Sequence, residues 1–309
     1  MKQNNEPPTP ADWRVIASGA GFVEGPVNQG EHVDFVSINR GSIYRANLDG
    51  SGFEIRAETG AGPNGAAVDA AGRLWIVQNA ARVMESQSEI VAGPGVQVID
   101  TDSKVLTEID LPDLHAPNDC AFGPDGRLWF TDPYGRLMPA PQGDPDRNSA
   151  HGRVWAYDAA SGNLELIAQH LPHPNGLCFT SDGSQLYVSD TRAKEIVALE
   201  VGGSGTRAVR TVAVLPEGAP DGMAFDVSGR LWIAATKAEG LAVLAHSGEW
   251  DFVSLGKSFP TNVCFAGPDL TTLVVTAARG GRVLVRDAEV PGLALYAGGN
   301  IAPSALASP

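Results

Sequence analysis

The stretch Pro117–Pro133 reads PNDCAFGPDGRLWFTDP, and altered copies of it recur along the chain. It opens with a polar residue in a turn, runs as a short apolar segment, turns at Gly-Pro-Asp-Gly and runs on as a second apolar segment. The other copies lie at 63–79, 174–190, 220–236 and, in degenerate form, 260–278, and a sixth begins at Phe22. The chain therefore contains six related units.

Each unit is predicted to hold four short strands. A further alternating or apolar segment precedes each polar turn, as at Phe53–Ala57, and another follows each paired core, as at Arg153–Tyr157. Gly, Pro, Asn and Asp separate these segments, and long stretches with a helical period are absent. The pattern predicts an all-β fold, a six-bladed β-propeller with four-stranded blades. We read 1–309 as one domain, with 1–12 and 296–309 as peripheral tails.

The N-terminal segment indicates how the ring closes. Trp13–Ala17, followed by SGAGFVE, resembles Phe53–Ala57, followed by ETGAGPN, yet no blade precedes it. We expect it to form the outermost strand of the last blade, because pairing the two ends of the chain removes an open sheet edge.

Composition narrows the class of protein. The 309 residues include 36 acidic and 22 basic side chains, a net charge of −14, and no cluster of Lys and Arg that would bind phosphate backbones. We therefore expect no nucleic-acid partner. The start lacks a signal-peptide pattern and no run approaches a membrane span, so we expect a cytoplasmic protein unless a leader has been removed. The three cysteines fall in inner strands and are predicted to pack in the core without disulfides.

The polar turn residues are the candidate functional residues. One from each unit should face the channel of the propeller, and all six carry side-chain oxygen: Glu24, Asn64, Asn118, Asn175, Asp221 and Thr261. Carboxylate and amide oxygens suit a hard divalent cation, first Ca²⁺, with Mg²⁺, Mn²⁺, Fe²⁺ or Zn²⁺ as substitutes. Asn-Gly and Asp-Gly are also ordinary turn dipeptides. Two of the six positions, however, carry the carboxylates Glu24 and Asp221 in place of Asn, and a bound cation would need their negative charge. This favours a metal site over turns that are repeated for local reasons alone.

These motifs resemble a known family. The EGP at Glu24, the PND at Asn118 with its FGPDGRLWFTDP continuation, the PNG at Asn175 and the PDG at Asp221 are similar to those of the senescence marker protein (regucalcin), gluconolactonase and luciferin-regenerating enzyme family, from about Trp13 to Leu295. The resemblance implies a six-bladed propeller and a metal-dependent lactonase. It implies metal ligation by Glu24, Asn175 and Asp221, and binding of substrate or metal by Asn118.

One departure leaves the substrate open. Regucalcin-like sugar lactonases place an Arg two residues before the asparagine of the second motif, where this chain has Ala116. The TDPYG continuation at Thr131–Gly135 is closer to the bacterial gluconolactonase branch. Specificity for a sugar lactone is therefore an expectation only.

Opening a lactone requires stabilisation of the carbonyl oxygen and removal of a proton from water. The cation would stabilise the carbonyl oxygen. For the base we favour Asp221, then Asp119, with Asp132 a third alternative. Candidate contacts to a small-molecule lactone are the following turn and loop residues: Asn64, Asn118, His115, Asp132, Tyr134, Arg136 and Thr261.

Two alternative functions and the role of one insertion stay open beside this interpretation. A phosphotriesterase of the diisopropyl fluorophosphatase type would need the same ligands, and a non-enzymatic propeller could hold the ion for structural reasons. The insertion Arg136–His151 is either a lid over the site or a plain surface loop. The oligomeric state is not revealed by the sequence.

Overall fold

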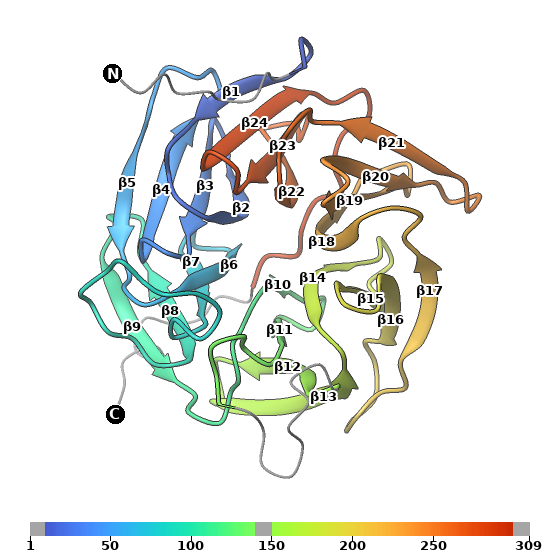
Figure 1. Cartoon of the computed structure of the whole chain (residues 1–309). Helices are drawn as coiled ribbons and strands as arrows, with labels where there is room; N and C mark the ends of the chain where they lie inside the picture. Colours follow the sequence, from blue (N-terminus) through green and yellow to red (C-terminus); the bar gives the residue numbers. More distant parts are fainter. Residues whose placement is uncertain (1–9, 140–149, 299–309) are drawn as a thin grey trace.

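The computed structural model describes residues 10–139 and 150–298. In these residues the chain forms six four-stranded antiparallel sheets arranged as blades around a central channel, which confirms the predicted six-bladed β-propeller (Figure 1). The described residues contain no helix long and apolar enough to cross a membrane. Most of the insertion Arg136–His151, expected to be either a lid or a plain surface loop, lies outside the described residues, as do residues 1–9 and 299–309 of the predicted tails.

Each blade is built from the channel outward. The innermost strands are β2 (Val23–Gln29), β6 (Pro63–Val68), β10 (Cys120–Phe122), β14 (Pro174–Phe179), β18 (Ala219–Phe225) and β22 (Pro260–Ala266). The second strands are β3 (His32–Ser37), β7 (Leu74–Gln78), β11 (Leu128–Asp132), β15 (Gln185–Asp190), β19 (Leu231–Thr236) and β23 (Thr272–Ala277). The third strands are β4 (Ser42–Asn47), β8 (Gly95–Ile99), β12 (Gly152–Asp158), β16 (Glu195–Glu200), β20 (Gly240–Leu244) and β24 (Arg282–Asp287). The outermost strands are β5 (Phe53–Glu58), β9 (Val105–Asp110), β13 (Asn163–Leu171), β17 (Arg210–Val214), β21 (Trp250–Ser254) and β1 (Arg14–Ala17).

The ring closes as predicted. Strand β1 pairs with β24, with Arg14 opposite Val285, so the last blade has the order β22-β23-β24-β1. The inner ends of the first and last blades are also joined, because Thr261 Oγ1 donates a hydrogen bond to Val23 O at 2.7 Å. Each end of the chain thus holds the other in place.

Large apolar side chains fill the spaces between blades. A tryptophan on the second strand of one blade meets a phenylalanine on the inner strand of the next, edge-on, in the pairs Trp75–Phe122 (5.6 Å between ring centroids), Trp129–Phe179 (5.7 Å) and Trp232–Phe265 (6.1 Å). Such pairs add about 0.5–1.5 kcal/mol each beyond their buried area. The three cysteines are buried and free, as expected.

The chain after β24 differs from the prediction. We expected a peripheral tail at 296–309, but its described part and the residues just before it pack against the propeller: Leu293 N donates to Phe225 O at 2.9 Å, and the Tyr296 ring lies 5.9 Å from that of Phe179. Gly298 forms an isolated bridge with Asp69 in the second blade. No local pattern in this segment indicates these contacts, because they are made with residues distant in sequence.

Candidate active site

Irregular pairing marks the start of the inner strands. In β2, β6, β14, β18 and β22 the register with the second strand shifts at or next to the polar turn residue, and in the third blade Asn118 precedes β10. Such a break in the ladder bends the strand and re-aims a side chain. Since all six inner strands start at the same end of the channel, the polar turn residues gather there.

Three carboxyl groups meet at this end, and all are buried. The pKa of Glu24 is raised to about 8 by burial and by the charge of Asp119. Burial raises the pKa of Asp119 to about 6. The pKa of Asp221 is raised well above its ordinary value by burial and by the charges of Glu24 and Asp119. The structure therefore brings Glu24, Asp119 and Asp221 close enough to repel one another.

The negative charge of this cluster could be balanced by a bound cation. One oxygen of Asp221, Oδ1, is buried without a hydrogen-bond partner among the described residues. Within the same part of the chain, no Lys or Arg forms an ion pair with Glu24, Asp119 or Asp221. Buried carboxylates normally pair with a cation or coordinate a metal, so a divalent ion fits what this chain supplies.

Asn175 adds an amide to the cluster. Its side chain lies next to Asp221, whose pKa it lowers, and Nδ2 donates to Thr191 Oγ1 at 3.0 Å. Its Oδ1 is the candidate ligand atom. The backbone is fixed from the preceding blade, because Thr131 Oγ1 donates to Asn175 O at 2.6 Å, and Ser189 Oγ likewise donates to Asp221 O at 2.7 Å.

Asn262 is a site residue that sequence reasoning missed. Its Nδ2 donates to Glu24 Oε2 at 3.1 Å and lies 3.3 Å from Asp119 Oδ2, so one amide joins two carboxyls across the channel. A signal was present: Asn262 and Asp119 follow their polar turn residues where the other four motifs have glycine. At Gly222 a Cβ would lie 1.9 Å from Asn262 Cγ, so the small residue makes room for the amide.

The other predicted ring residues are buried at the same end of their strands. Asn118 is 8% exposed and Asn64 2%, and Asn64 Nδ2 has no hydrogen-bond partner among the described residues. Thr261 is fully buried, and its hydroxyl is engaged with Val23 O and Thr276. Thr261 therefore joins the last blade to the first and offers no free oxygen to a ligand.

Asp132, predicted as a substrate contact or base, instead holds the turn that carries Asn118. Oδ1 accepts hydrogen bonds from His115 N and Ala116 N, both at 2.8 Å, and Oδ2 accepts from Arg153 at 2.7 Å and Trp155 at 3.1 Å. The side chain is fully buried. With four donors on two oxygens, Asp132 has a positioning role.

An aromatic cluster lies beside that turn. The rings of His115 and Tyr134 are 4.9 Å apart, and Tyr134 lies 5.5 Å from His151. The pKa of His115 is lowered to about 4 by burial and by the charge of Arg153, so its imidazole is neutral at pH 7. Its Nδ1 is buried without a hydrogen-bond partner among the described residues. Arg136 is exposed at the start of the insertion.

The donor set suits some metals better than others. Glu24, Asn118, Asn175 and Asp221 offer only carboxylate and amide oxygens, the ligands of hard cations such as Ca²⁺. Among the described residues no group of three or more His, Cys, Asp or Glu side chains has the arrangement of a metal site. A site here therefore depends on the asparagine oxygens as well as the two carboxylates.

A six-bladed propeller with carboxylate and amide oxygens at one end of its channel defines a structural class. Within it, residues 22–279 match the family described as the SMP-30/Gluconolactonase/LRE-like region, and the chain belongs to that family. The match confirms the resemblance drawn from the EGP, PND, PNG and PDG motifs.

Individual relatives agree with this assignment. Pentonolactonase XacC of Haloferax volcanii is 27% identical over 279 residues, 86% of this chain and 85% of that protein. The 6-deoxy-6-sulfogluconolactonase of Pseudomonas putida is 35% identical over 164 residues, 51% of this chain and about half (54%) of its own length. Among solved structures, the calcium-binding protein regucalcin of Agrobacterium tumefaciens has the same fold, with a TM-score of 0.73 at 19% identity over 93% of this chain and 97% of that one.

Proposed function

We propose that this protein is a metal-dependent hydrolase that opens a lactone ring. The observation that carries the proposal is the cluster of three buried carboxyls, Glu24, Asp119 and Asp221, with which no Lys or Arg of residues 10–139 and 150–298 forms an ion pair. Two relatives of the chain are named as lactonases, which supports the reaction class.

In this proposal Glu24, Asn118, Asn175 and Asp221 hold one divalent cation, with Ca²⁺ the first choice. When bound, such an ion draws electron density from a carbonyl oxygen and so stabilises the charge that develops as water adds. Asn262 keeps Glu24 in place, and the hydroxyls of Thr131 and Ser189 fix the two turns that carry Asn175 and Asp221.

The proton released from water goes to a carboxylate. We assign this step to Asp221, because its Oδ1 is buried at the site and accepts no hydrogen bond among the described residues. Asp119 is the alternative. Its pKa of about 6 suits a base near neutral pH, but Oδ1 accepts from Cys120 N and Oδ2 faces Asn262.

In this proposal the substrate contacts the side of the channel that carries Asn118. His115 and Tyr134 form an aromatic wall next to this residue, and the neutral imidazole can exchange hydrogen bonds with hydroxyl groups. Two relatives are named as a pentonolactonase and a 6-deoxy-6-sulfogluconolactonase, so we favour an aldonolactone as the substrate class. Ala116 supplies no charge at the position where regucalcin-like enzymes have Arg.

The test is hydrolysis measured by pH-stat on pentono- and gluconolactones, an aliphatic lactone and an aryl phosphotriester, each with saturating Ca²⁺. We expect turnover of at least one aldonolactone, reduced about a hundredfold or more in Asp221→Asn. Faster turnover of the phosphotriester would favour the fluorophosphatase-like alternative. No turnover of any substrate would favour a binding propeller with a structural ion.

A further inference from the structure

The far end of the channel holds a second, different compartment. A chamber of about 500 Å³ is lined by the later part of every inner strand, including Val27, Val68, Phe122, Phe179, Phe225 and Phe265. These residues follow the polar turn residues along strands that all run in the same direction. The chamber and the carboxyl cluster therefore occupy opposite ends of one channel.

Two residues separate the compartments. Asp119 and Asn262 line the chamber, and Asn262 also donates to Glu24 in the carboxyl cluster. Neither Glu24 nor Asp221 lines the chamber. The Asn262–Asp119 contact across the channel forms the partition.

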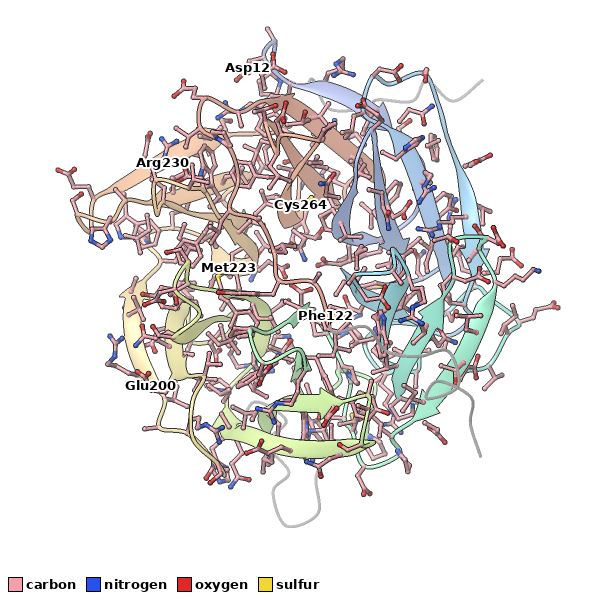
Figure 2. The ribbon with its side chains drawn as sticks, turned by 180° about the vertical axis from the view of Figure 1, so that it is seen from behind. Asp12, Phe122, Glu200, Met223, Arg230 and Cys264 are labelled. Atoms are coloured by element: carbon pink, nitrogen blue, oxygen red, sulfur yellow. The ribbon has the colours of Figure 1, made fainter. Side chains whose placement is uncertain are left out.

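The C-terminal segment closes the other end. Gly292 N donates to Leu270 O at 2.9 Å in the last blade, and Gly298 bridges to Asp69 in the second blade, so the chain between them spans the channel. Leu293 and Tyr296 line the chamber. Figure 2 shows this segment crossing the centre of the molecule near Phe122 and Met223.

The walls of the chamber are mainly apolar. Besides four phenylalanines, the lining includes Met223 and all three cysteines, which come from the third, fourth and sixth blades. Burial raises the pKa of the Cys264 thiol to about 12, so this thiol is uncharged at neutral pH. A channel that held only water would have many polar wall atoms, since buried water needs two to four polar partners.

Four polar side chains at the chamber wall already have partners, and two of them, Asp119 and Asn262, contact each other. Asp69 accepts from Arg73 and Trp75, and the Asn28 side chain is paired with Gly30 and Gly267. No Lys, Arg or His lines the chamber among the described residues. An anion entering here would therefore lose its hydration without compensation.

We propose that this chamber is a ligand site distinct from the candidate active site, and that it binds a neutral, mainly hydrocarbon small molecule. Its volume lies within the range of about 300–1,000 Å³ that is typical of small-molecule sites. Transfer of apolar surface from water into such walls provides the driving force. The proposal does not depend on lactone hydrolysis.

The experiment uses the full chain and the neutral fluorescent probe N-phenyl-1-naphthylamine, with 1-octanol as competitor. We expect saturable binding of one probe per chain and displacement by octanol, both unchanged when a chelator removes metal from the other compartment. Absence of saturable binding would overturn the proposal.

Variants localise the probe. Ala66→Phe and Ala121→Phe each place a ring at the chamber wall and should weaken binding at least tenfold, whereas Ala160→Phe, on an exposed turn, should leave it unchanged. Circular dichroism establishes that each variant is folded. Equal affinity in all three folded variants would overturn the proposal.

A second measurement needs no variant of the wall. In protein labelled with ¹³C-methyl methionine, octanol should shift the Met223 signal in a saturable manner and leave those of Met84 and Met138 in place. The Met223→Leu protein assigns the signal. A Met223 methyl that does not respond to saturating octanol would contradict the proposal, even if the phenylalanine variants fail to fold.

Discussion

Binding of Ca²⁺ to the metal-free protein should release protons, and the structure sets how many. With a pKa of about 8, Glu24 is about 90% protonated at pH 7. A carboxyl must lose its proton to bind a metal. Glu24 alone should therefore release about 0.9 proton per ion, and Asp221, whose pKa is also raised, should add to this.

Isothermal titration calorimetry at pH 7, in buffers with different ionisation enthalpies, measures the release directly. The association constant should rise about tenfold or more per pH unit below pH 8, because Glu24 must lose its proton to bind the ion and the raised pKa of Asp221 adds to this dependence. In Glu24→Gln the release should fall by about one proton and the affinity should drop. Binding without proton release at pH 7, or an affinity independent of pH between 6 and 8, would refute the proposed ligand set.

Other perturbations test separate parts of the site. The metal-free protein should lose stability as the pH rises from about 5 to 8, because carboxyls whose pKa is raised by folding bind protons more tightly in the folded state. If urea unfolding showed that stability rises over this range, the three carboxyls would not repel one another as described. Asp221→Asn should weaken this decline, since it removes one of the repelling charges, and an unchanged pH dependence would place Asp221 outside the cluster. Asp132→Ala should lower the free energy of unfolding by about 3 kcal/mol, because it leaves Arg153 without its buried partner; a loss under about 1 kcal/mol would disprove the positioning role. Asn262→Ala removes a hydrogen bond that lowers the pKa of Glu24, so Glu24 should hold its proton more tightly in this variant. Affinity for Ca²⁺ should therefore fall at pH 7 and recover above pH 8. A loss of affinity that is independent of pH would indicate a different role for Asn262.

The propeller could be predicted from the sequence because each blade repeats one pattern of apolar segments and turns. The closing strand could also be predicted, since Trp13–Ala17 repeats the pattern of Phe53–Ala57. The polar turn residues were found in the same way, and the pKa shifts of Glu24 and Asp221 place two of them together.

What the repeat could not predict is where one blade touches another. The repeat pattern places Thr261, not Asn262, in line with the other polar turn residues, and the Thr261 hydroxyl joins two blades instead of facing a ligand. Asp132 is a carboxylate of the kind common in active sites, but its partners His115 and Ala116 lie just before the motif, at the end opposite Asp132. The C-terminal segment is ordered by hairpin turns of distant blades, which no local pattern reveals.

The most direct test of the metal site is metal analysis of the purified protein, followed by lactone hydrolysis before and after complete chelation. We predict about one divalent cation per chain, loss of turnover when the ion is removed and recovery when Ca²⁺ is returned. A fully metal-depleted protein that opens lactones at the original rate would contradict the proposed role of Glu24, Asn118, Asn175 and Asp221.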